Sequence, residues 1–247
     1  MSENPPVTAA SDRGGERPRA YDAVIAAVEE QIVAGQLRVG DRLPGERDLA
    51  ARLGVSRAAV REALRMLQAL GVVRAGVGVG PDGGTALVSM PSESLTLFLR
   101  LHVALANFPT DDVIEARVML ERWSVGLAAR HATQADLDAL AGFLAGMEEP
   151  DVSRERFNDL DIAFHLALAE AGGNRLVTDM TTAIRASMKA PILASFHATP
   201  AWDELVDGLR AGHRRVHDAV VARDAEAAAD AVEEHVRYAY SALSWTN

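Results

Sequence analysis

The order of the elements predicted between residues 20 and 89 constrains the fold more than any other feature of the sequence. Apolar residues at helical spacing, with glycines ending each run, predict three helices, and a glycine-rich stretch after them predicts a small hairpin. The predicted segments are a helix over 20–35, a link over 36–44, a helix over 45–54, a helix from the N-cap Ser56 to about Leu70, and a hairpin over 72–90. Helix, helix, tight turn, helix and hairpin is the order of a winged helix-turn-helix, whose third helix enters the major groove of DNA.

The third of these helices presents a row of cations. Arg57, Arg61 and Arg65 fall within about 80° of arc when each residue turns the helix by about 100°. The neighbouring face is apolar and consists of Val60, Leu64 and Leu67. A solvated arginine face is the simpler interpretation, but the third-helix position, the scarcity of balancing acids and the glycine-rich hairpin favour contact with DNA. Arginine suits this role because its planar guanidinium bonds bidentately to phosphate and to guanine.

The net charge of −10 is unevenly spread along the chain. Residues 1–89 hold 11 basic and 11 acidic side chains, whereas residues 90–247 hold 14 basic and 24 acidic ones and account for the whole excess. Between Arg52 and Arg74, five arginines accompany the single acid Glu62. This local positive field, rather than the sum over the chain, governs attraction to a nucleic acid. We therefore expect the two parts of the chain to face different partners.

Residues 35–73 read GQLRVGDRLPGERDLAARLGVSRAAVREALRMLQALGVV and resemble the DNA-binding signature of the GntR family of bacterial transcription regulators. The elements that match at fixed spacings are Gly35, Leu37, Gly40, Leu43-Pro44, Glu46-Arg47, Leu49-Ala50, Leu53 to Arg57, Val60-Arg61, Ala63-Leu64, Leu67 and Gly71. The resemblance implies that DNA is contacted by Arg47, Ser56, Arg57, Ala58 and Arg61, and by a wing tip at Gly83 and Gly84 that reaches the minor groove. Arg65 joins this set by its place on the helix face alone. An ion pair of Arg47 with Glu46 or with the third helix is the alternative.

Beyond about residue 90 the sequence predicts helix almost throughout. The predicted helices span 93–107, 111–131, 133–147, 153–172, 174–189, 202–223 and 225–244. Breaks are predicted at Pro109, Pro150, Gly172-Gly173, Pro191, Pro200 and near Asp224. The expected fold is therefore mainly α and has three parts: a disordered lead over 1–18, a winged helix-turn-helix domain over 19–89, and an all-helical domain over 90–247.

Composition excludes several classes of protein. The chain has no cysteine, so it has neither disulfides nor thiolate metal sites, which agrees with a reducing cytoplasm. No apolar stretch reaches the roughly 18 residues of a membrane span, and the N-terminal residues lack the apolar core of a signal peptide. We therefore expect a cytoplasmic protein that makes no contact with a membrane.

The helical part of the chain holds candidates for a metal site. Asp161 and His165 lie four residues apart on one face of a predicted helix, so a carboxylate and an imidazole can meet one cation. His213 and His235 lie 11 residues on either side of the predicted turn, so an antiparallel helix pair would bring them to the same level. One carboxylate and three imidazoles suit Zn or Ni, with Co and Mn as further choices, and leave positions open for water or a ligand. His217 is an alternative ligand, and purely structural histidines are the simpler interpretation.

The same part of the chain resembles the FCD ligand-sensing domain of the FadR subfamily of GntR regulators over nearly all of residues 95–243. The matching stretches are EARVMLERWSVGLAA at 115–129, DIAFHLALAEAGGN at 161–174 and HRRVHDAVVARDAEAAADAVEEH at 213–235. Many domains of this kind hold a divalent metal through one Asp and three His. The resemblance implies that the corresponding ligands here are Asp161, His165, His213 and His235.

The resemblance also implies an effector. It assigns the carboxylate of a small organic acid to Arg117, with Arg185 as a second candidate, whereas an ion pair with Glu121 is the alternative for Arg117. The whole sequence thus predicts a transcription regulator, in the first instance a repressor, that binds an inverted repeat in double-stranded DNA as a homodimer. The rival interpretations are a metal-dependent hydrolase-like enzyme that uses the Asp and His centre, and a DNA-binding protein whose histidines are structural.

Overall fold

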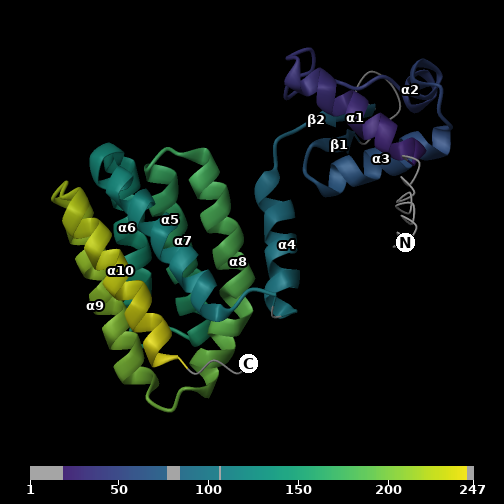
Figure 1. The fold of residues 1–247 in the computed structure, drawn as a ribbon. Coiled ribbons are helices and arrows are strands. Elements are labelled where there is room, and N and C mark those ends of the chain that lie inside the picture. The colour runs from purple at the N-terminus through teal and green to yellow at the C-terminus, as the bar shows by residue number, and fades with distance from the viewer. Residues whose placement is uncertain (1–18, 77–83, 106, 244–247) are drawn as a thin grey trace, which may run out of the picture. The chain divides into compact units, whose positions relative to one another are not determined.

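A computed structural model describes residues 19–76, 84–105 and 107–243 of the chain (Figure 1). The lead predicted over 1–18 lies outside the described residues. The chain divides into two compact units, of which one ends at Ser89 and the other begins at Met90. No helix in the described ranges is both long and apolar enough to cross a membrane.

The first unit has three helices and a two-stranded antiparallel hairpin. Its elements are α1 (Ala20–Val33), α2 (Glu46–Leu53), α3 (Arg57–Ala69), β1 (Val73–Gly76) and β2 (Gly84–Leu87). Both α1 and α2 pack against α3, and β1 also contacts α3. The buried side chains that join these elements include Val24, Val28, Leu49, Val60, Leu67, Val73 and Leu87. The predicted winged helix-turn-helix is confirmed.

Local signals explain the tight turn that precedes α3. Gly54 ends α2 with a φ of 65°, a left-handed conformation that glycine adopts without strain. The Ser56 hydroxyl then accepts a hydrogen bond of 3.1 Å from the backbone N–H of Ala59 and caps α3. Arg42 in the predicted link forms an isolated bridge with Ala86 of the hairpin. The link is thereby attached to the wing.

The second unit consists of helices. They are α4 (Pro91–Ala104), α5 (Thr110–His131), α6 (Gln134–Met147), α7 (Arg154–Ala171), α8 (Arg175–Ala198), α9 (Trp202–Val221) and α10 (Ala225–Ala242). Helix α10 packs against both α5 and α9, helix α7 contacts α5, α6 and α8, and α4 lies along α8. Figure 1 shows α9 and α10 side by side, as the predicted turn near Asp224 requires. The bundle therefore directs the inner faces of α5, α7, α8, α9 and α10 toward a common interior.

The predicted break at Pro191 is wrong, because α8 continues through this residue from Arg175 to Ala198. A proline inside a helix removes one backbone hydrogen bond and costs about 3 kcal/mol. Beyond it, however, the helix buries Ile192 and Phe196 in the core of the bundle. Burial of two such side chains contributes about 1.5–3 kcal/mol each, which offsets the cost. Tertiary packing thus outweighs the local signal.

Candidate metal centre and DNA-binding surface

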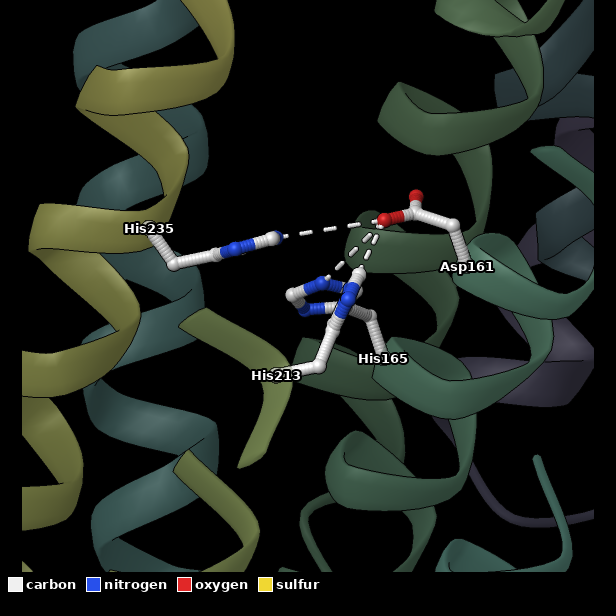
Figure 2. A group of neighbouring side chains, drawn as sticks. All are labelled: Asp161, His165, His213 and His235. Carbon is white, nitrogen blue, oxygen red and sulfur yellow. Dashed lines mark hydrogen bonds and ion pairs between the residues drawn. The ribbon is translucent and has the colours of Figure 1, made fainter. Parts of the chain in front are cut away.

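Four side chains that are distant in sequence meet inside the helical bundle. Asp161 and His165 come from α7, His213 comes from α9 and His235 comes from α10 (Figure 2). All four are buried, and one ligand atom from each lies within 4.8 Å of the others. They form a group that could hold a metal ion, with the membership that the sequence predicts. The alternative His217 is not part of this group, and its Nδ1 lies 3.3 Å from Asp218.

The geometry of the group centres on one carboxylate oxygen. Asp161 Oδ1 lies 2.9 Å from Nε2 of His213, 3.7 Å from Nε2 of His165 and 3.9 Å from Nε2 of His235. Figure 2 shows the dashed contacts of the three rings meeting at this one oxygen. Three Nε2 atoms and one carboxylate oxygen therefore surround a single small space.

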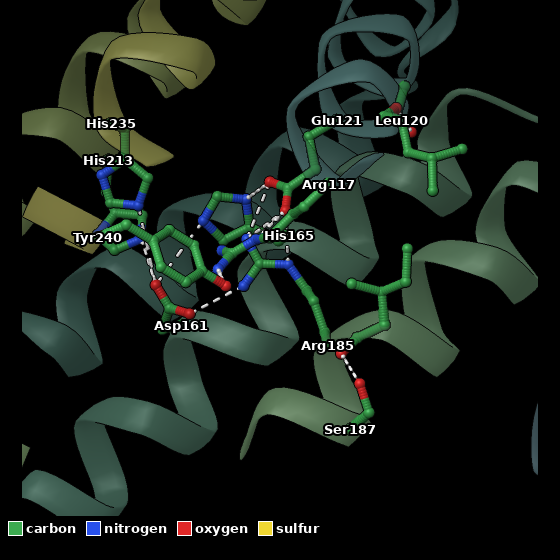
Figure 3. Close-up of polar contacts among 12 residues, drawn as sticks. Arg117, Leu120, Glu121, Asp161, His165, Arg185, Ser187, His213, His235 and Tyr240 are labelled. Atoms are coloured by element: carbon green, nitrogen blue, oxygen red, sulfur yellow. Dashed lines mark hydrogen bonds and ion pairs between the residues drawn. The ribbon is translucent and has the colours of Figure 1, made fainter. Parts of the chain in front are cut away.

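Hydrogen bonds and ion pairs to residues outside the group hold Asp161 and His165 in place (Figure 3). Arg185 Nη1 donates to Asp161 Oδ2 over 2.9 Å, while Nε and Nη2 of the same guanidinium donate to the two oxygens of Glu121 over 3.1 and 2.9 Å. Glu121 Oε2 in turn lies 2.6 Å from His165 Nδ1. This is the carboxylate–histidine arrangement that usually orients an imidazole toward a metal. The sequence identified Glu121 only as an i, i+4 partner of Arg117 and missed its contact with His165.

Arg117 belongs to the same buried network. Its Nε donates to Glu121 Oε1 over 2.6 Å, and its Nη1 donates to the Tyr240 hydroxyl over 3.2 Å. The guanidinium also lies over the Tyr240 ring, 5.4 Å from the ring centre. The sequence suggests two arginines for an effector. Arg185 uses all three of its nitrogens to bond to Glu121 and Asp161. Arg117 also bonds to Glu121, and its remaining contact is with Tyr240 of α10.

The protonation states in this cluster are those that metal ligands need. Burial alone would raise the pKa of the Asp161 carboxyl, but Arg185 and His213 outweigh it and hold that pKa well below its usual range. Burial and the charge of Arg185 lower the pKa of His165 to about 4. Burial and the neighbouring His213 likewise lower the pKa of His235 well below its usual range. At neutral pH the carboxylate is ionised and these two imidazoles are neutral.

Three imidazole nitrogens of the group, His165 Nε2, His213 Nδ1 and His235 Nδ1, are buried without a hydrogen-bond partner among the described residues, and the first of them tests whether the group fits a metal. His165 Nε2 is buried and has no hydrogen-bond partner among the described residues, although the other nitrogen of the ring is held by Glu121. Buried polar atoms are rarely left unpaired, and this one faces the space beside Asp161 Oδ1. Gly212 adds a second sign of fit, because a Cβ at this position would lie 2.5 Å from Nδ1 of His235. The glycine lets α9 and α10 approach closely enough to complete the group.

The residues predicted to contact DNA lie on the surface of the first unit. Arg57, Ala58, Arg61 and Arg65 are all exposed on α3. Arg61 Nε approaches Glu46 Oε2 at 4.0 Å, at the limit of an ion pair, and leaves most of its side chain in solvent.

Of the four remaining predicted contacts, three lie within the described residues. Arg47 is 84% exposed and lies 3.3 Å from the neighbouring Asp48 rather than pairing with Glu46. Ser56 is used as the cap of α3. On the wing, Gly84 begins β2 with a φ of 119°, whereas Gly83 lies outside the described residues.

Comparisons with known proteins agree with this architecture. Residues 20–81 match the family described as bacterial regulatory proteins, gntR family, and residues 112–238 match the FCD domain. The Glc operon transcriptional activator of Escherichia coli K12 is 30% identical over 90% of this chain and 88% of its own length. The regulator LutR of Bacillus subtilis 168 is 30% identical over 86% of this chain and 96% of its own length.

A further relative and a solved structure extend the comparison. A putative L-lactate dehydrogenase operon regulatory protein of Escherichia coli K12 is 29% identical over 91% of this chain and 86% of its own length. A solved structure of Streptococcus agalactiae GntR aligns with a TM-score of 0.59 at 22% identity over 90% of this chain and all of that chain, which supports the fold. Members of this family are DNA-binding regulators, so the enzyme interpretation is set aside. The chain belongs to the GntR family of bacterial transcription regulators and carries an FCD ligand-binding domain as its second unit.

Proposed function

We propose that the FCD domain holds one divalent metal ion through Asp161, His165, His213 and His235, and that a small organic carboxylate bound beside it controls affinity for an operator. The observation that carries this proposal is the convergence of three Nε2 atoms on one carboxylate oxygen, with His165 Nε2 left without a partner. Bound to these residues, a divalent ion would supply Lewis acidity and open coordination positions for an anion.

The donor set narrows the choice of metal. Three imidazoles and one carboxylate suit borderline ions, so Zn or Ni is proposed first, with Co and Mn as further choices. Hard ions such as Mg and Ca prefer oxygen ligands and fit this set poorly. The residues around the ligands agree with this choice, because Glu121 already fixes the imidazole of His165 in the required orientation.

Charge balance supports an anionic effector. The buried network contains two guanidinium groups, Arg117 and Arg185, and two carboxylates, Glu121 and Asp161, so it is neutral without a metal. A divalent cation would leave two positive charges in a buried site, and a carboxylate would reduce that excess. One relative is named for an L-lactate dehydrogenase operon, so L-lactate is a suitable first acid to test. Arg117 is the proposed contact for its carboxylate.

We further propose that the protein acts as a homodimer on an inverted repeat. Helices α5 and α8 pack together, and each carries exposed apolar side chains one turn apart. These side chains are Met119 and Trp123 on α5, and Leu176 and Met180 on α8. Apolar surface of this kind is typical of an interface, and a two-fold dimer would pair two winged domains with two half-sites. Repression remains the predicted direction of regulation, although one relative is named an activator.

Metal titration tests the centre of this proposal. Protein stripped with a chelator should bind one Zn or Ni ion per chain in isothermal titration calorimetry. His213→Ala should weaken binding at least about tenfold, since it removes a ligand outright. His197→Ala is the matched control, because His197 is a half-exposed histidine outside the group and should leave the affinity unchanged. Absence of any bound metal in the parent protein would exclude the metal centre.

A further inference from the structure

We infer that Tyr240 is the gate through which a small organic acid reaches the buried centre from solvent. The inference rests on the proposed function, because it concerns how an effector enters that same site. Tyr240 lies near the end of α10, five residues after His235. It is buried in the bundle, and only 6% of the residue is exposed. Figure 3 shows its ring beside Asp161 and its hydroxyl directed at Arg117.

Tyr240 lines two pockets. The inner pocket reaches the buried network and is lined by Arg117, Asp161, His235 and Tyr240, together with apolar side chains. The outer pocket opens on the surface of the bundle and is lined by Asp111, Ile114, Glu115, Arg237, Tyr240 and Ser241. Among the described residues, Tyr240 is the one member common to both linings. Tyr240 therefore contributes both to a pocket that opens to solvent and to one that reaches the centre.

The sizes of the pockets require a movement. The inner pocket has a volume of about 10 Å³, whereas the outer one has a volume of about 460 Å³. A space of the inner size accommodates about one water molecule and no organic acid. A carboxylic acid can enter only if part of the wall moves, and the shared side chain of Tyr240 is the part whose movement joins the two pockets.

The chemistry of the closed gate favours exchange with a carboxylate. Arg117 Nη1 donates to the phenol oxygen of Tyr240 over 3.2 Å in the closed arrangement. A carboxylate accepts a hydrogen bond from a guanidinium more strongly than a phenol does, since the bond is then assisted by both charges. An incoming acid would therefore take this donor from Tyr240. The outer pocket has two carboxylates, Asp111 and Glu115, against the single guanidinium of Arg237, so it does not itself attract an anion. It serves as a passage, and the carboxylate is attracted by the buried centre.

Because Tyr240 and His235 share α10, entry of an acid is coupled to that helix. Displacing the phenol removes a contact between α10 and α5, the helix that carries Arg117. The end of α10 would then move relative to α5, while His235 remains at the centre. The effector would therefore bind the open arrangement of Tyr240 better than the closed one. Such a difference in affinity is what allows a ligand to change the regulatory state.

Access to the centre can be measured without any metal or effector. Diethyl pyrocarbonate acylates neutral imidazoles and is similar in size to a small organic acid. In metal-stripped full-length protein, mass spectrometry would follow modification of the buried His235 against the exposed His197 as an internal reference. Tyr240→Ala should accelerate modification of His235 at least about tenfold, because opening no longer requires the ring to move. Tyr240→Phe, which removes the hydroxyl that accepts from Arg117, should accelerate it about threefold or more.

Tyr238→Phe is the matched control, since Tyr238 lies on the same helix but lines neither pocket. It should leave the rate of modification unchanged. Equal rates in Tyr240→Ala and the parent protein would overturn the gate. If circular dichroism shows that Tyr240→Ala does not fold, the comparison of Tyr240→Phe with Tyr238→Phe decides in its place, and equal rates there overturn the gate too. A failed zinc titration would remove the metal proposal and would leave this labelling result intact.

Discussion

At the scale of single residues, Glu121 is the carboxylate on which the buried network depends. It contacts both Arg117 and Arg185 and also His165. Glu121→Gln keeps the shape but leaves two buried guanidinium groups against one carboxylate, so we expect a loss of about 3–5 kcal/mol in the free energy of unfolding. Zinc affinity should fall about 10- to 100-fold, because the imidazole of His165 loses its orienting partner.

Urea unfolding followed by circular dichroism and zinc titration measure these two effects of Glu121→Gln. Glu115→Gln is the control, because Glu115 is an exposed carboxylate on the same helix that pairs with Arg237. It should change neither quantity. A parent-like zinc affinity in Glu121→Gln would show that the contact with His165 does not position the ligand.

On α3, the arginines can be distinguished by the kind of DNA contact that each is predicted to make. Arg57→Ala and Arg61→Ala should each cost about 1–3 kcal/mol in operator binding and relax sequence preference at one position, as expected for contacts with base edges. Arg65→Ala should instead weaken operator and unrelated DNA equally if it contacts phosphate. Fluorescence anisotropy at two salt concentrations would distinguish these results. Unchanged affinity after the Arg57 and Arg61 substitutions would exclude α3 as the reading helix.

At the scale of whole elements, Gly212 controls how closely α9 approaches α10. Gly212→Ala would bring a Cβ to 2.5 Å from His235 Nδ1, so the ring or the helix must shift. We expect a loss of about 1–3 kcal/mol in stability from this overpacking. We also expect zinc affinity to fall at least about tenfold, since one ligand is displaced.

Gly142→Ala provides the contrast for Gly212→Ala, because a Cβ at Gly142 in the exposed middle of α6 meets nothing within 4 Å. Replacing a glycine with alanine inside a helix should there increase stability by about 0.5–1 kcal/mol and leave zinc affinity unchanged. Thermal unfolding of the two variants should therefore shift in opposite directions. If Gly212→Ala instead raised the unfolding temperature as Gly142→Ala does, the close approach of α9 and α10 would impose no constraint.

These elements also show what a sequence can and cannot predict. The four proposed ligands could be grouped in advance, because helix periodicity places Asp161 and His165 on one face and a symmetric turn brings His213 and His235 level. The hydrogen bonds between Arg185 and Glu121 could not be predicted in this way. The two residues are 64 positions apart and meet only because α8 packs beside α5. Pro191 shows the same limit, because the core that extends α8 past it is assembled from distant segments.

At the scale of the whole molecule, dimerisation should depend on the exposed apolar side chains of α5 and α8. Trp123 is 60% exposed on α5, and a charge at its position would have to be desolvated in any interface formed there. Trp123→Glu should therefore convert a dimer to a monomer at micromolar concentration in sedimentation velocity. Its affinity for an inverted repeat should fall at least about tenfold, while its weaker affinity for a single half-site should not change, because only the gain from binding two half-sites together is lost.

The matched control for Trp123→Glu is Val221→Glu, which adds the same charge at an exposed apolar side chain at the end of α9. This variant should remain dimeric and bind the inverted repeat as the parent does, so that charge alone cannot explain a loss of affinity. If Trp123→Glu also remains dimeric, the two-fold contact lies on another surface. If it becomes monomeric but retains full affinity for the inverted repeat, each half-site is recognised independently, and an effector could then regulate binding only within one chain.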